Sequence, residues 1–370
     1  MALVTLVLLF CALHSGIRAE AGFDVTLRLD LTSAEQTLAL YEGRHGNPRQ
    51  IAALKGSQIA LATTSLIVQR PLETATLEQS LEAAKFNQDL GEDLFRMREA
   101  RSQVREIREL LEEVQRRNFG ERVVRTVEQL FPADARVRRS VPVFFVAFGH
   151  TNVDAYVRRV VWEGDSPHFV GEGQGEITIV VNLSRAVSYG RSVDERFLGL
   201  LSVVAHEVFH AAFAAYKDGS PLWRAYYAGG NSYLEQLMDI AHNEGIAYYL
   251  SLIQATRGKL PPGWEENVRA SFERFNRQGE ELLDPELSRQ RAYDIIRQSN
   301  TSGYWQSYGA MAGMVIARQI DQTLGRTALV ETVRDGPVSF FSTYLRVMER
   351  DDRVPKLSDR LAREIRRLWR

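Results

Sequence analysis

The stretch from Ser192 to Lys217 reads SVDERFLGLLSVVAHEVFHAAFAAYK and decides how the rest of the sequence is interpreted. Ser192 and Glu195 form a capping box, the pattern that begins a helix, while Gly219 and Pro221 are placed to end it. Because most residues between these signals are apolar, we expect this helix to be buried. Three ionisable side chains near its centre interrupt the apolar run, and burying them is costly unless a partner such as a metal ion compensates.

These three side chains form the motif His206-Glu207-x-x-His210. Residues four apart on a helix lie on one face, so both imidazoles can bind a single Zn²⁺. Glu207 lies beside that face, where its carboxylate can take a proton from a water that the zinc activates. The spacing predicts His206 and His210 as zinc ligands and Glu207 as a catalytic base. A structural pair of hydrogen-bonded histidines with an exposed Glu207 is the alternative interpretation.

A catalytic zinc site needs a third protein ligand, which the next predicted helix, from Ser232 to about Arg257, can supply. Glu244 lies on a face of that helix that is otherwise apolar, and an acid there requires a cation. His242 lies about 160° away from Glu244 around the helix, so the two side chains cannot both point at one metal. We predict Glu244 as the third ligand, with His242 and Asp239 as rivals that could instead orient a ligating imidazole.

The composition narrows the chemistry further. Lys and Arg together number 46 and Asp and Glu 47, which gives a formal net charge of −1. This balance argues against a nucleic-acid-binding surface built from bulk charge. The single cysteine, Cys11, excludes a disulfide framework, a thiolate zinc cluster and an iron–sulfur centre made by this chain alone. Any metal site must therefore use nitrogen and oxygen ligands.

The motif at residues 206–210, followed by a helix carrying Glu244-Gly245-x-Ala247, resembles the gluzincin group of zinc metallopeptidases. More narrowly, it is similar to bacterial zinc-dependent proteases classed under a domain of unknown function, over about residues 140–345. The resemblance implies a zincin-like catalytic domain with Zn²⁺ as cofactor and a peptide or protein as substrate. The sequence departs from the best-known members in two ways. Its 33 residues between His210 and Glu244 form a longer gap, and Ala247 and Tyr248 replace the last two signature residues.

The same resemblance implies two further parts of the site. The apolar run at 176–182 resembles the edge strand that holds peptide substrates in zincins. An electrophilic side chain is expected to support the oxyanion, and Tyr308 is our first candidate and Tyr304 our second. For either tyrosine, simple packing in the core is the alternative.

The apolar patterns predict a mostly helical α+β fold with a small β-sheet and an active-site helix. Helical patterns extend from Thr32 to about Gln129, strands are expected at 141–148, 157–162 and 176–182, and the glycine-rich stretch 171–175 resembles a hairpin connection. The predicted parts are a signal peptide at 1–21, a helical N-terminal region at 22–135, a zincin-like metallopeptidase domain at 136–350 and a C-terminal amphipathic helix at 351–370. We expect this last helix to pack on the domain, with contact to an anionic membrane as the alternative.

The first residues resemble an export signal. Residues 3–13 form an apolar run, and Ala19-Glu20-Ala21 is a cleavage site of the small-residue type, while a buried N-terminal strand or helix is the alternative. We therefore expect an exported protein, periplasmic or extracellular, with no integral membrane segment after signal removal. Cleavage would leave no cysteine, which favours a bacterial envelope.

Together these patterns predict a zinc-dependent hydrolase, most simply a metallopeptidase that cleaves peptide bonds with a Glu-activated, zinc-bound water. One alternative is a catalytically silent envelope protein that uses the zincin fold to bind a peptide or partner. Another is a zinc hydrolase of a small amide, ester or epoxide, which a deep closed pocket would favour.

Overall fold

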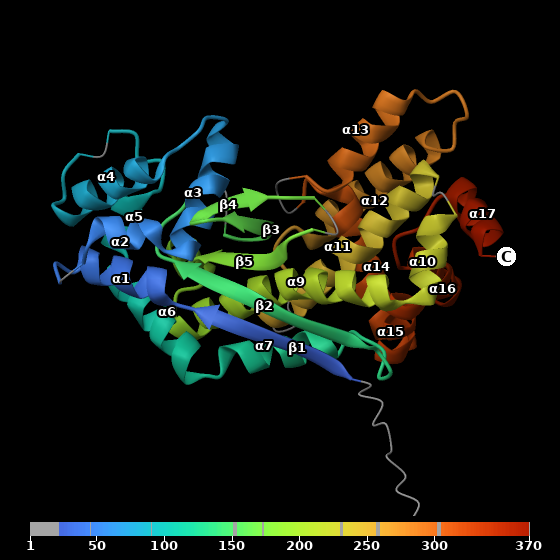
Figure 1. Ribbon diagram of the computed structural model, residues 1–370. Helices are drawn as coiled ribbons and strands as arrows, with labels where there is room; N and C mark the ends of the chain where they lie inside the picture. The colour runs from blue at the N-terminus through green and yellow to red at the C-terminus, as the bar shows by residue number, and fades with distance from the viewer. Residues whose placement is uncertain are drawn as a thin grey trace, which may run out of the picture.

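A computed structural model describes residues 22–44, 46–89, 91–150, 154–171, 174–229, 232–256, 260–301 and 305–369. The predicted signal peptide and Tyr304 lie outside these residues. The described chain is a mostly helical α+β fold with one small mixed sheet, as the sequence predicts (Figure 1).

The sheet has five strands in the order β1-β2-β5-β3-β4. Their bounds are β1 Phe23–Asp30, β2 Val137–Val146, β3 Ala155–Glu163, β4 Ser166–Phe169 and β5 Glu176–Asn182. The strands β1, β2 and β5 are parallel, whereas β3 runs antiparallel to both of its neighbours, β5 and β4.

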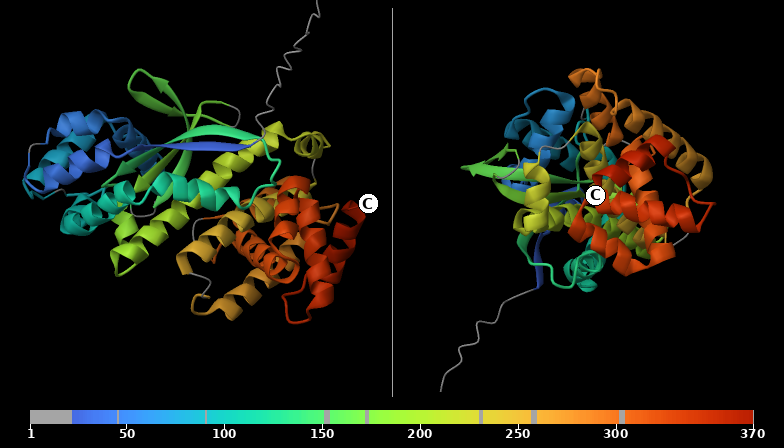
Figure 2. Two further views of the ribbon diagram at one scale, coloured as in Figure 1. Left: turned by 90° about the horizontal axis from the view of Figure 1, so that it is seen from below. Right: turned by 90° about the vertical axis from the view of Figure 1, so that its right-hand side faces the viewer.

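Helices cover the sheet and extend beyond it. In the N-terminal part they are α1 Thr32–Tyr41, α2 Pro48–Ala53, α3 Lys55–Val68, α4 Thr74–Lys85, α5 Met97–Ser102, α6 Val104–Arg116 and α7 Phe119–Glu128. After the sheet follow α8 Leu183–Ala186, a short 3-10 helix Val187–Tyr189, α9 Val193–Gly219, α10 Pro221–Ala228, α11 Tyr233–Thr256, α12 Trp264–Glu281, α13 Arg289–Ser299, α14 Tyr308–Leu324, α15 Arg326–Asp335, α16 Pro337–Arg350 and α17 Asp359–Leu368. Figures 1 and 2 show α1 to α5 at one end of the sheet and the helices from α12 onward at the other, while α7 runs alongside β1.

Three expectations about the strands are wrong. The strand at 176–182 is not an edge strand, because β5 lies between β2 and β3. The stretch 171–175 lies between β4 and β5, which do not pair, and the hairpin is instead the one between β3 and β4. The region 22–135 is not wholly helical, since it begins with β1, which pairs with β2 along its whole length.

Helix α9 is the central helix of the protein. Its capping box is present, with the Ser192 hydroxyl accepting a hydrogen bond from the Glu195 backbone N–H and the Glu195 carboxylate accepting one from Ser192. By length and composition α9 is apolar enough to cross a membrane, with a mean hydropathy of 1.6 over its most apolar window. Since 61% of that window is buried inside the structure, α9 occupies the position of a core helix.

The C-terminal helix α17 packs on the rest of the chain. It buries Leu361, Ala362 and Ile365 and contacts α12 and α16. Its apolar face is therefore covered by protein in this structure.

Helices α11 and α14 cross at unusually short range, where Gly245 meets Gly313. A Cβ atom on Gly313 would lie 1.8 Å from the Ala241 carbonyl oxygen, and one on Gly245 would lie 2.3 Å from the carbonyl carbon of Gly313. Only glycine at both positions allows this crossing, because any larger residue would overlap the facing backbone. The crossing fixes α11 next to the position where it presents Glu244.

We expect Gly313→Ala to lower the free energy of unfolding by about 2 kcal/mol or more, because the added methyl group must push two backbones apart. Chemical denaturation measures this change. The matched control is Gly120→Ala in α7, where a Cβ would lie 3.7 Å from Leu27 in ordinary contact. There the alanine is expected to leave stability unchanged or raise it by up to ~1 kcal/mol. Equal effects of the two substitutions would contradict the close crossing.

Candidate metal centre

Two neighbouring helices bring together the three side chains predicted to bind zinc. His206 and His210 lie one turn apart on α9, and Glu244 comes from α11. The two Nε2 atoms are 3.1 Å apart, and a Glu244 oxygen lies 3.3 Å from Nε2 of His210 and 3.7 Å from Nε2 of His206. Tetrahedral ligands with bonds of ~2.0–2.1 Å lie about 3.3–3.4 Å from one another. The three atoms therefore have the spacing that one zinc ion requires.

Hydrogen bonds at the far side of each ring fix which nitrogen faces the site. Nδ1 of His210 lies 3.1 Å from the Asn243 side-chain oxygen, while the His206 ring interacts with the backbone carbonyl of Ala247 and has its Nδ1 3.5 Å from the Ser251 hydroxyl. With oxygen atoms facing Nδ1, each neutral ring carries its proton there and presents a lone pair at Nε2, which is the form that binds a metal. Two lone pairs and a carboxylate then converge, and a cation is needed between them.

The pKa values of His210 and Glu244 are shifted in opposite directions by their contact with each other. Burial alone would lower the pKa of His210, but the Glu244 carboxylate outweighs this effect and raises the pKa to about 9. Burial alone would raise the pKa of Glu244, but His210, His206 and a hydrogen bond from Asn300 lower it to about 2. The two shifts describe an ion pair in which a proton on His210 balances the Glu244 carboxylate, and a bound metal cation would replace that proton.

Glu207 occupies the position expected of a base beside this centre. It follows His206 directly, is half-buried and so stays accessible from solvent. Burial raises its pKa to about 7, and the neighbouring Glu244 adds to this, while His210 and Arg158 act in the opposite direction. A carboxyl group with a pKa near neutrality can both accept and return a proton.

The two rival ligands lie outside the group of three. Asp239 accepts a hydrogen bond from the Tyr227 hydroxyl at 2.9 Å. His242 is fully buried and stacks on Trp223 with ring centroids 5.9 Å apart, and neither of its ring nitrogens has a hydrogen-bond partner among the described residues. Neither residue orients a ligating imidazole as expected, because Asn243 and the Ala247 carbonyl occupy those positions.

Tyr308, the first candidate from the sequence for support of the oxyanion, makes its hydrogen bond to another part of the chain. Tyr308 is buried, and its hydroxyl donates a hydrogen bond to the Ile295 carbonyl at 2.8 Å. Tyr304 lies outside the described residues. The sequence reasoning missed Tyr248, whose ring lies edge-on to His206 at 4.6 Å between centroids. Its position one helical turn after Glu244 was the available signal.

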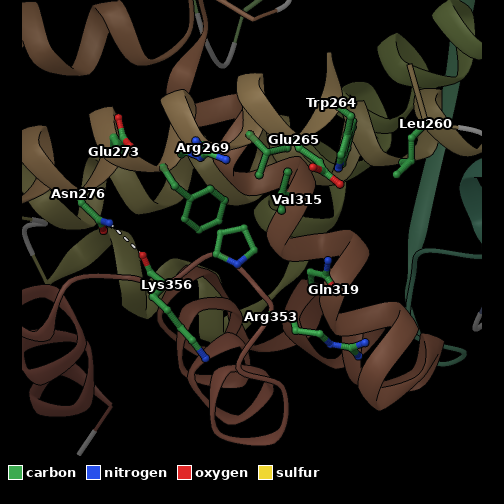
Figure 3. A pocket seen from close by; sticks show the side chains of 13 residues that line it. Leu260, Trp264, Glu265, Arg269, Glu273, Asn276, Val315, Gln319, Arg353 and Lys356 are labelled. Carbon is green, nitrogen blue, oxygen red and sulfur yellow. Dashed lines mark hydrogen bonds between the residues drawn. The ribbon is translucent and has the colours of Figure 1, made fainter. Parts of the chain in front are cut away.

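A cavity of about 630 Å³ opens beside the centre and is lined in part by Glu244 and Asn243. A second cavity of about 610 Å³ lies between α12, α14 and the segment before α17, and none of the predicted site residues lines it. Figure 3 shows this second cavity, with Trp264 and Val315 at its wall and Asn276 hydrogen-bonded to the Lys356 backbone. Of these two cavities, the one lined by Glu244 is therefore the one that adjoins the metal centre.

Two imidazoles on the buried helix α9 and a carboxylate on α11 form a ligand set typical of the zinc centres of hydrolases. A model of the family described as "Putative zinc dependent peptidase (DUF5700)" matches residues 49–353, and the chain belongs to this family. Membership of this family supports a zinc hydrolase at the level of the family, and a peptidase family implies peptides or proteins as substrates. The match begins well before residue 140, so the expected extent of the resemblance was too short. No curated protein and no solved structure matches the chain.

We expect Asn243→Ala to weaken zinc binding by about 10- to 100-fold, because His210 loses the hydrogen bond that fixes its tautomer. Asn243→Asp, which keeps an acceptor oxygen, should retain most of the affinity. Competition with a chelator measures both variants. The control is Asn267→Ala on α12, where the amide donates a hydrogen bond to the Gly263 carbonyl. Undiminished affinity in Asn243→Ala would contradict this role.

Replacement of His242 tests whether this residue only packs in the core or also binds zinc. We expect His242→Phe to keep full zinc content and to be at least as stable as the wild type, because two unpaired buried nitrogens are removed from an aromatic cluster. His210→Phe should lose zinc. Elemental analysis and thermal unfolding check both variants, and loss of zinc in His242→Phe would restore it as a ligand.

Proposed function

We propose that the protein hydrolyses peptide bonds at a centre where His206, His210 and Glu244 hold zinc and Glu207 acts as the general base. The observation that carries the proposal is the convergence of three acceptor atoms at zinc-ligand spacing, with an accessible carboxyl group in the same helical turn. Membership of a zinc-dependent peptidase family supports the reaction class.

The residues of the chain have distinct parts in this reaction. When bound, zinc supplies Lewis acidity, which polarises the substrate carbonyl and makes water a stronger acid. Glu207 takes the proton from the attacking water and returns it to the nitrogen of the leaving amine, so that it ends the cycle in its starting state. The Asn243 and Ala247 oxygens keep both imidazoles in the tautomer that binds metal.

We assign Tyr248, rather than Tyr308, to the support of the developing oxyanion. Its ring lies against His206, and burial, aided by the carboxylates of Glu244 and Glu207, raises its pKa to about 12. The hydroxyl therefore keeps its proton at neutral pH and can donate it in a hydrogen bond to negative charge on the substrate. Export to a bacterial envelope remains a separate prediction from residues 1–21.

The decisive variant is Glu207→Gln, which keeps the size of the side chain and removes the base. We expect peptide hydrolysis to fall by at least about 10²- to 10⁴-fold while zinc content stays stoichiometric. Cleavage of a mixed peptide library, followed by mass spectrometry, measures the activity. Glu109→Gln on α6, whose side chain is half exposed, serves as the matched control. Full activity in Glu207→Gln would show that another group is the base.

A further inference from the structure

The cavity beside Glu244 is lined by charged side chains of both signs. It is enclosed by α9, α10, α11 and β3, and its lining includes three basic side chains, Arg159, Lys217 and Arg224. Its volume of about 630 Å³ is in the range of pockets that bind small molecules or a few residues of a peptide. Because Glu244 and Asn243 form part of its wall, whatever occupies it lies next to the proposed scissile bond.

Two of the charged residues in this wall already have partners. Lys217 donates a hydrogen bond to the Tyr227 hydroxyl at 3.0 Å, and that hydroxyl donates in turn to Asp239 at 2.9 Å. The Lys217 ammonium group also lies over the Phe213 ring, 4.9 Å from its centroid. Lys217 and Asp239 thus compensate each other through Tyr227 and stabilise one side of the cavity.

Arg159 differs from Lys217 and Asp239 in the partners of its side chain. It is half-buried, and its guanidinium group has neither a hydrogen bond nor an ion pair to any of the described residues. The backbone that carries it is held firmly, since Arg159 pairs with Ile177 of β5 and its carbonyl accepts a hydrogen bond from Val170. A rigid strand therefore presents an uncompensated cation to a cavity beside the metal centre.

Placing a cation in this position without a protein partner costs desolvation energy that a bound anion would recover. Guanidinium groups bind carboxylates through two parallel hydrogen bonds, which fix both position and orientation. Arg224, whose guanidinium group binds the Asp218 backbone carbonyl at 3.3 Å, adds positive charge at the exposed side of the cavity. Asp218 is the remaining acidic residue in the wall of the cavity. Because its side chain is exposed to solvent, it reduces the positive potential of Arg159 and Arg224 less than a buried carboxylate would.

We infer that this cavity is a specificity subsite for a carboxylate group of the peptide substrate, and that Arg159 is its principal binding residue. The inference rests on the proposed peptidase function and names the substrate class, peptides with a carboxylate close to the cleaved bond. Two sources supply such a group, the C-terminus of the substrate and the side chain of Asp or Glu. The subsite distinguishes either of them from a neutral amide of nearly the same shape.

The test compares peptides in matched pairs that differ only in this group. One pair has a free or an amidated C-terminus, and the other has Glu or Gln at one internal position of an amidated peptide, with each position scanned in turn. We expect the wild type to prefer the carboxylate member of at least one pair by about 10- to 100-fold in kcat/KM. The pair that shows the preference identifies the source of the carboxylate.

Variants then assign the preference to Arg159. Arg159→Gln should reduce the ratio within the pair to about threefold or less while the neutral peptide is cleaved as before, and Arg159→Glu should favour peptides with Lys. Arg105→Gln on α6, whose side chain is 81% exposed, is the control and should keep the wild-type ratio. Equal rates within every pair in the wild type, or a ratio that survives in Arg159→Gln with intact zinc content, would overturn the inference.

Binding measurements distinguish a failure of the subsite inference from a failure of the proposed peptidase function. The same pairs are titrated by calorimetry into zinc-loaded Glu207→Gln protein, with and without Arg159→Gln. A carboxylate preference that depends on Arg159, found together with a wild type that cleaves no peptide, would retain the subsite and overturn the proposed peptidase function. Cleavage without any preference in rate or binding would retain the peptidase and overturn the subsite.

Discussion

The centre of this protein depends on one electrostatic constraint, that two imidazoles and a carboxylate from two buried helices converge on one point that a cation can occupy. Nε2 of His206, Nε2 of His210 and a Glu244 oxygen lie within 4.8 Å of one another. The Asn243 side-chain oxygen at Nδ1 of His210 favours the tautomer whose Nε2 faces this point. A metal cation satisfies all three atoms at once, and the surrounding features can be understood as ways of keeping them in place.

The helix packing keeps the distances short. Glycines 245 and 313 let α14 approach α11 until the backbones touch, directly beside Glu244. The capping box begins α9 two turns or more before its histidines, so they lie in regular helix rather than at a frayed end. The site is thus built on rigid elements, which position ligands more accurately than loops do.

The sequence was sufficient where short-range rules apply. The motif at 206–210, the capping residues and the choice of Glu244 on an apolar face all follow from helix geometry. The order of strands in the sheet does not follow from such short-range rules. The place of β5 between β2 and β3 is determined by pairing between segments far apart in the sequence. The strand β1 had a visible signal, the alternating apolar residues Phe23, Val25, Leu27 and Leu29, which the helical patterns that follow obscured. Tyr248 also had a signal, its position four residues after Glu244, whereas the burial of Tyr308 against Ile295 depends on contacts between distant segments.

His242, Asn243 and Glu244 are consecutive residues, and neighbours on a helix point about 100° apart. One turn of α11 therefore touches the aromatic core, the His210 ring and the metal position at the same time. The rotation of α11 about its own axis is fixed from both sides, by hydrophobic packing and by coordination. Because the same turn serves packing and coordination, zinc binding to these ligands would also stabilise the packing of α11 against its neighbours.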